Sequence, residues 1–280
     1  MASSSRMGRA RRTNVIAGTL LSLFVAVGLG PYVFMVVTSV KTNDQFNESY
    51  WVPTWPFHWD NYAAAWRQVS PYLYSSVIVA GLAIVGSVAF SAVAAHVFAR
   101  YRFAGRNLLF ALIAALLMVP PLTSLIPLFV LMRDLGILDS RLVLIVPHVV
   151  SGAILGVVLM RTYIARIPGE LYEAAGVDGA GGIRMFLSIT LPLARPAIGV
   201  VSLLTVLNVW NDYFWPFLTV STDEYRTIPA GLAFFAGQNV TVWGPLFAGY
   251  TISSIPLLLL FTFVSRAFLA GIQGGLAVNR

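Results

Sequence analysis

Residues 142–160 read LVLIVPHVVSGAILGVVLM, an apolar run without a charged side chain. A helix needs about 20 mostly apolar residues to cross a bilayer. Further runs of this kind occupy residues 15–40, 72–97, 108–132, 197–218 and 246–269. The sequence therefore predicts an all-α polytopic membrane protein with six transmembrane helices, forming a single domain over residues 15–270.

The composition supports a membrane protein. Hydrophobic residues make up 58% of the chain and charged residues only 10%, with a mean hydropathy of +0.80. Soluble proteins carry roughly a quarter charged residues, so this chain cannot bury its apolar surface in one aqueous core. The chain has no cysteine, which excludes disulfides and thiolate metal sites but leaves the redox compartment undecided.

Basic residues are distributed unevenly between the two sides of these runs. With the N-terminus inside, the cytoplasmic set is Arg6, Arg9, Arg11, Arg12, Arg100, Arg102, Arg106, Arg161, Arg166, Arg184, Arg195, Arg266 and Arg280, and the external set is Lys41, Arg67, Arg133, Arg141 and Arg226. The positive-inside rule then predicts cytoplasmic tails at residues 1–14 and 271–280. The net charge of +7 reflects this topology, so it does not imply a nucleic-acid partner. The first run is too long for a cleaved secretory signal, which predicts a retained anchor.

The longest cytoplasmic interruption, residues 166–192, carries a spaced pattern: Glu173-Ala174-Ala175, then Gly179, then Ile189-x-Leu191-Pro192. Pro168 favours the first turn of a helix, and Glu170 and Glu173 place negative charge near its N-terminus. Leu171, Ala174 and Ala175 form a small apolar face, and Gly176 and Gly179 are expected to end the helix. We expect a short rigid helix that fits a groove in another protein.

The fifth apolar run contains a polar cluster whose candidate path residues are Asn208, Trp210, Asn211, Asp212 and Trp215. Spacings of three and four place most of them on one helix face. An acid at membrane depth is costly unless it faces protein or water, which makes Asp212 a functional candidate. Hydrogen bonding between helices is the alternative explanation. His96 and His148 are interpreted as packing residues.

Other features predict a packed bundle. Small residues recur every four positions in the second run, at Ala83, Ser87, Ser91 and Ala95, a pattern that lets another helix of the chain approach closely. Pro120, Pro121 and Pro127 are expected to break the third run. The tryptophans fall in external segments or outer helix halves, which is typical of an interfacial belt or, alternatively, of a docking surface for a sugar-binding protein.

The loop pattern resembles the EAA loop of bacterial ABC importer permeases, and Trp210-Asn211-Asp212 is similar to MalG-like permeases of carbohydrate importers. The resemblance implies a non-catalytic permease of the bacterial cell membrane that carries a sugar or sugar derivative. It assigns contact with an ATPase to Glu170, Glu173, Ala174, Ala175, Asp178, Gly179 and Ala180. The sequence differs from the family pattern in its C-terminal tail, which lacks the usual lysine. It also differs at Gly181 and Gly182, where a capping serine is common in the family.

The same resemblance implies several partners. These are a second, MalF-like permease, a dimer of ATP-binding-cassette ATPases, an extracytoplasmic solute-binding protein, the sugar substrate and membrane lipid. No cofactor or metal is expected in this chain, since ATP and Mg would bind the partner ATPase. In agreement, the sequence has no Gly-x-x-x-x-Gly-Lys-Ser/Thr phosphate loop.

Other functions remain open at this stage. A glycerol phosphate ester is the second candidate cargo, because similar permeases import such esters. A secondary transporter would tolerate an intramembrane acid, but inverted repeats would be expected and none is evident. A membrane enzyme would need an acid–base or metal constellation, which the sequence does not display.

Overall fold

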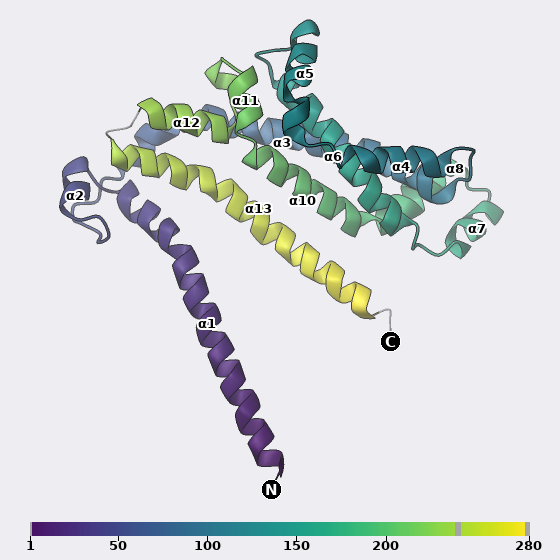
Figure 1. The fold of residues 1–280 in the computed structure, drawn as a ribbon, viewed down its shortest axis with the longest axis horizontal. Coiled ribbons are helices and arrows are strands. Elements are labelled where there is room, and N and C mark those ends of the chain that lie inside the picture. The colour runs from purple at the N-terminus through teal and green to yellow at the C-terminus, as the bar shows by residue number, and fades with distance from the viewer. Residues whose placement is uncertain (1, 239–241, 278–280) are drawn as a thin grey trace. The chain divides into compact units, whose positions relative to one another are not determined.

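A computed structural model describes residues 2–238 and 242–277, with side chains for residues 17–238, 242–259 and 262. Within these ranges the regular structure is helical, which confirms the predicted all-α class. The helices, drawn in Figure 1, are α1 (Ala2–Ser39), α2 (Asn43–Glu48), α3 (Asp60–Arg100), α4 (Arg106–Leu116), α5 (Pro121–Asp134), α6 (Arg141–Ile164), α7 (Glu170–Val177), α8 (Gly182–Met185), the π-helical η1 (Phe186–Thr190), α9 (Leu191–Leu193), α10 (Arg195–Asn211), α11 (Phe214–Thr219), the 3-10 turn η2 (Asp223–Tyr225), α12 (Ile228–Gln238) and α13 (Trp243–Ala277).

Among the described side chains, three helical stretches are long and apolar enough to cross a membrane: Ala17–Ser39, α3 and α6. Two bent pairs raise this number to five if each pair is one span. The sixth predicted run, residues 246–269, lies within the bounds of α13, but many of its side chains lie outside the described residues. The count of six spans and the orientation of the termini therefore remain predictions, and Arg280 in the C-terminal tail also lies outside the described residues.

Proline breaks the third predicted run as expected. Helix α4 ends at Leu116, α5 begins at Pro121, and the two are bent by 95°. The expected break at Pro127 was wrong, because Pro127 lies inside α5. A second bend of 72° separates Gly182–Leu193 from α10. The fifth predicted run, residues 197–218, was expected to be one helix, and this was wrong because α10 ends at Asn211 and α11 begins at Phe214.

The chain divides into two compact units, which are described separately: residues 1–68 with 235–252, and residues 69–234 with 253–280. In the first unit, Asn61 donates hydrogen bonds to the backbone oxygens of Ser39 (2.9 Å) and Lys41 (3.0 Å). The buried Lys41 ammonium donates to the Ser49 oxygen at 2.5 Å. Trp51, with 74% of its surface exposed, leaves open whether the external tryptophans form a belt or a docking surface.

In the second unit, α3 and α6 approach closely along the predicted small-residue stripe. Ser87 and Ser91 are fully buried, and the Ser87 hydroxyl donates to the Val149 oxygen at 3.2 Å. A Cβ atom on Gly152 would lie 2.3 Å from Ser87 Oγ, and one on Gly156 would lie 2.6 Å from Ser91 Oγ. Only glycine fits at these α6 positions, which confirms that the stripe packs within the chain.

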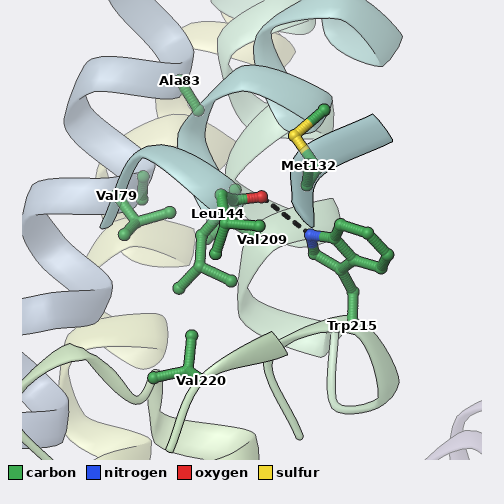
Figure 2. Close-up of a cluster of buried hydrophobic side chains, with 9 residues drawn as sticks. Val79, Ala83, Met132, Leu144, Val209, Trp215 and Val220 are labelled. Carbon is green, nitrogen blue, oxygen red and sulfur yellow. Dashed lines mark hydrogen bonds between the residues drawn. The ribbon is translucent and has the colours of Figure 1, made fainter. Parts of the chain in front are cut away.

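A second contact in this unit is a cluster of buried side chains around Trp215 of α11 (Figure 2). The Trp215 side chain is 7% exposed, packs in a cluster that includes Met132 and Leu144, and donates its indole N–H to the Val143 oxygen at 2.8 Å. Burying the indole with its N–H paired gives up no hydrogen bond. Trp215 is therefore packed in the core of this unit, and its assignment to the translocation path stays a prediction.

Asp139, in the turn between α5 and α6, forms hydrogen bonds with the segment that follows α11. Asp139 has a φ of 52°, and its carboxylate accepts the Thr222 N–H (2.8 Å), the Thr222 hydroxyl (2.7 Å) and the Ser221 N–H (2.8 Å). These hydrogen bonds, with that from the Thr222 backbone first in importance, hold the pKa of Asp139 below its ordinary value.

The close approach of α3 and α6 generates a stability prediction. Gly156→Ala places a methyl group against Ser91, and we expect a loss of about 1–3 kcal/mol from overpacking. Thermal unfolding of the purified chain measures this effect. Gly81→Ala is the matched control, because nothing lies within 4 Å of a Cβ atom at Gly81 of α3. Equal unfolding temperatures for the two variants would contradict the tight contact.

Candidate functional site

The loop at residues 166–192 contains the predicted short helix, α7, which begins at Glu170 and ends at Val177. Gly169 occupies the N-cap, so Pro168 precedes the helix and does not form its first turn as expected. Glu170 and Glu173 lie in the first turn and are exposed, where their charge is favourable to the helix dipole.

Gly179 ends this helix by its backbone conformation. Its φ is +78°, and the Ala180 N–H donates to the Ala175 oxygen at 2.8 Å while the Gly179 N–H donates to the Gly176 oxygen at 3.0 Å. This pairing satisfies carbonyls at the helix end. No atom lies within 4 Å of a Cβ built on Gly179, so the requirement for glycine is conformational. Gly176 was expected to help stop the helix, but it lies inside α7.

Two large aliphatic side chains of the loop are exposed. Val177 is 90% exposed and Ile183 is 78% exposed. Leu171 and Ala174 of the predicted apolar face are also exposed, whereas Ala175 is half-buried. Sequence reasoning did not single out Val177 or Ile183, although two large aliphatic residues beside glycines in a polar loop could have indicated a contact surface. Asp178 is exposed at the end of α7.

The polar cluster of the fifth predicted run is organised by a residue from another helix. His148 of α6 lies with Nδ1 2.9 Å from Asn208 Oδ1 and with Nε2 3.2 Å from Asp212 Oδ2. Both ring nitrogens thus face oxygen atoms, and a protonated imidazole can donate to both. His148 was interpreted as a packing residue. It is buried, but its ring also joins the two candidate polar side chains, a contact that sequence spacing could not reveal.

A helix break changes the predicted shared face. Asp212 has φ −78° and ψ 102°, so residues before and after it do not follow one helical register. Its Oδ1 accepts the Trp215 N–H at 3.2 Å, in the manner of a cap for α11. The break therefore separates Asn208 and Asn211 from Trp215.

The candidate path residues thus have different environments. Asn208 is exposed and contacts His148, and Asn211 is exposed with its amide donating to the Leu207 oxygen at 2.7 Å. Trp210 is half-buried, and Trp215 belongs to the core. The structure brings Asn208 and Asp212 together through His148.

A cavity of about 150 Å³ opens beside this cluster. Its walls are Leu117, His148, Ser151, Gly152, Leu155, Leu204, Thr205 and Asn208. Imidazole, hydroxyl and amide groups alternate there with aliphatic side chains. Such a surface can form hydrogen bonds with hydroxyl groups of a ligand and contact its apolar faces.

Comparison with known proteins gives a consistent result. The family described as binding-protein-dependent transport system inner membrane component matches residues 87–273. The chain is 34% identical to a probable ABC transporter permease protein, YurM, of Bacillus subtilis over 91% of this chain and 85% of that protein. It is 30% identical to the diacetylchitobiose uptake system permease protein NgcG of Streptomyces coelicolor, over 95% of this chain and 89% of that protein.

A solved structure supports the fold. A chain in the crystal structure of a bacterial ABC transporter involved in import of the acidic polysaccharide alginate superimposes with a TM-score of 0.79. The match covers 96% of this chain and 99% of that chain at 22% sequence identity. At this identity the similarity concerns the fold alone.

The contact of His148 with Asp212 generates a double-mutant prediction. His148→Leu leaves the Asp212 carboxylate without its imidazole partner, and since 21% of the Asp212 side chain is exposed we expect a loss of about 1–3 kcal/mol. The double variant His148→Leu/Asp212→Leu should lose less than the sum of the single variants, because neither polar side chain of the pair is then left without the other. Thermal unfolding of the four proteins measures the coupling, and strictly additive losses would contradict it.

Proposed function

The chain belongs to the family of binding-protein-dependent transport system inner membrane components, and from that premise we propose that it is the permease subunit of an ABC importer for a sugar or sugar derivative. The observation that carries the cargo class is the 30% identity, over 95% of this chain, to a permease named for diacetylchitobiose uptake. Because diacetylchitobiose is a sugar, a carbohydrate cargo is the simplest assignment.

In this proposal the chain crosses the bacterial cell membrane six times with both termini in the cytoplasm. The distribution of arginines supports this orientation. It places the loop at residues 166–192 in the cytoplasm, where an ATPase can reach it. The bent pair α4–α5 would serve as one span, and α10 with α11 as another, because broken helices are tolerated at membrane depth where protein or water satisfies the freed backbone groups.

The loop is proposed to bind the ATPase through α7. Exposed aliphatic side chains at Val177 and Ile183 would lose contact with water on docking. Glu170, Glu173 and Asp178 would present carboxylates to basic residues of the ATPase, and the fixed turn at Gly179 would hold α7 at a constant angle. Ala174, Ala175 and Ala180 would allow close approach of the partner.

The polar cluster is proposed to line the translocation path or its gate. Polar side chains at Asn208, Asn211 and Asp212 interrupt apolar helices, and polar groups at this depth require protein, water or cargo as partners. The adjoining cavity with hydroxyl and aliphatic walls suits a sugar. Trp210, which is half-buried, is assigned to the same path, whereas Trp215 packs in the core.

This chain would transport only as part of a larger complex. A second, MalF-like permease, a dimer of ATPases holding ATP and Mg, and an extracytoplasmic solute-binding protein would complete the importer. Closure of the ATPases would pull on the docked loop and shift the helices between outward and inward openings. The chain itself would supply binding and motion, and hydrolysis of ATP would take place in the partner.

The function is tested by co-purifying the chain with its partners in lipid nanodiscs and measuring ATP hydrolysis. We expect a sugar, presented with the solute-binding protein, to stimulate hydrolysis several-fold, as conformational coupling energies of about 1–3 kcal/mol allow. Glycerol phosphate esters and amino acids are the comparison solutes. Stimulation by one of these and by no sugar would overturn the carbohydrate assignment.

The role of the loop is tested with Glu173→Ala. Removing one partner of a desolvated interfacial charge pair costs about 2–5 kcal/mol, so we expect the ATPase to be lost during purification. Gly179→Asp should have the same effect, because it places a side chain at a φ of +78°. Glu48→Ala is the matched control, since it removes an exposed carboxylate at the end of α2. Retention of the ATPase by all three variants would show that the loop is not its docking site.

A further inference from the structure

A buried hydroxyl of the loop forms contacts with two other helical segments. Thr190, at the end of η1, is fully buried. Its Oγ1 lies 2.9 Å from Nδ1 of His96 in α3 and 2.8 Å from the hydroxyl of Tyr172 in α7. One side chain therefore links α7 and η1 to α3, which is distant from both in the sequence.

The protons of this network can be arranged consistently. Thr190 has one hydroxyl proton, so it donates to one neighbour and accepts from the other. Tyr172 can donate to Thr190 and Thr190 to His96, or the order can be reversed. In both arrangements each of these contacts is a hydrogen bond. Valine at position 190 has nearly the same shape but would leave Tyr172 and His96 without this partner, which is costly at a buried site.

Arg100 connects the same region to the end of α6. Its Nη2 donates to the backbone oxygens of Ile164 (2.5 Å) and Ile167 (2.7 Å). Carbonyls at a helix C-terminus lack partners within the helix and carry partial negative charge, so a guanidinium is favourable there. The Arg100 guanidinium carbon also lies 4.1 Å from the centre of the Tyr172 ring. Tyr172 is thus contacted by the Arg100 guanidinium at its ring and by the Thr190 hydroxyl at its own hydroxyl.

Helix α7 has few other attachments. It contains no buried residue, and Tyr172 and Ala175 are its half-buried ones. Tyr172 also packs against the buried cluster that includes Ile164 and Ala194. On the other side of the network, Phe186 at the start of η1 lies with its ring 5.2 Å from the His96 ring. The position of α7 therefore depends largely on the contacts of Tyr172.

We propose that His96, Arg100, Tyr172 and Thr190 form a latch that holds α7 rigidly to the ends of α3 and α6. Thr190 and Tyr172 act as positioning residues, since they would not contact the ATPase or the cargo. The inference rests on the proposed function of the loop: with the latch closed, a pull on α7 moves α3, and with the latch open it bends the loop. Losing one buried hydrogen bond shifts such an equilibrium by roughly a factor of ten.

The latch is tested first by its rigidity. The chain has no cysteine, so spin labels can be attached at Gly176→Cys in α7 and Val85→Cys in α3, both exposed positions outside the proposed ATPase contact. In the assembled transporter in nanodiscs, we expect a narrow distance distribution for the parent and for Thr190→Ser, which keeps the hydroxyl. Thr190→Val and Tyr172→Phe should broaden it. Tyr172→Phe keeps the ring over which Arg100 lies, so it provides a second variant if Thr190→Val folds poorly.

The second measurement is the number of solute molecules transported per ATP hydrolysed. We expect this ratio to fall about tenfold in Thr190→Val and Tyr172→Phe, with the ATPase still bound, and to be restored in Thr190→Ser. Narrow distributions in both variants would overturn the latch, and a parental ratio despite broadened distributions would overturn its role in transmission. If the parent itself fails to bind an ATPase, the proposed function fails, while the label distances still decide whether α7 is held as inferred.

Discussion

Backbone hydrogen bonding in lipid is the constraint on which this structure depends. Inside a bilayer no water is available to an exposed N–H or C=O group, so each spanning segment must satisfy its own backbone as a helix. Wherever a helix stops at membrane depth, the freed groups require partners from the protein. In the proposed six-span topology the breaks between α4 and α5 and between α10 and α11 would lie at membrane depth, and the second break lies at the cluster of His148, Asn208 and Asp212.

Sequence patterns predicted the local features of the fold well. Prolines at 120 and 121 predicted the first break because the missing N–H and the ring act on the chain immediately around them. The stripe from Ala83 to Ala95 predicted close packing, since small side chains permit it whichever partner is present. Gly179 was expected in a conformation other residues avoid, and its φ of +78° agrees.

Features that depend on distant contacts were not predictable in the same way. The stretch from Val209 to Tyr213 contains neither proline nor glycine, so a continuous helix was expected. The break instead coincides with Asp212, whose carboxylate contacts His148 and accepts the Trp215 N–H, and the preference of aspartate for helix ends was the available local signal. Thr190 and His96 lie 94 residues apart, and no periodicity connects them. Whether the loop binds an ATPase and the cluster meets cargo depends on molecules outside this chain.

The contact of α3 with α6 has a mechanical consequence. Its surfaces are made of Ser87, Ser91, Gly152 and Gly156, residues with few or no rotamers to exchange. Two helices that touch through long side chains can shift relative to each other, because the side chains can change rotamer. Two helices whose backbones touch through glycine and serine cannot shift in this way. The two helices should therefore move together as a rigid pair. Any bending should occur within α3 or α6 and not at the contact between them.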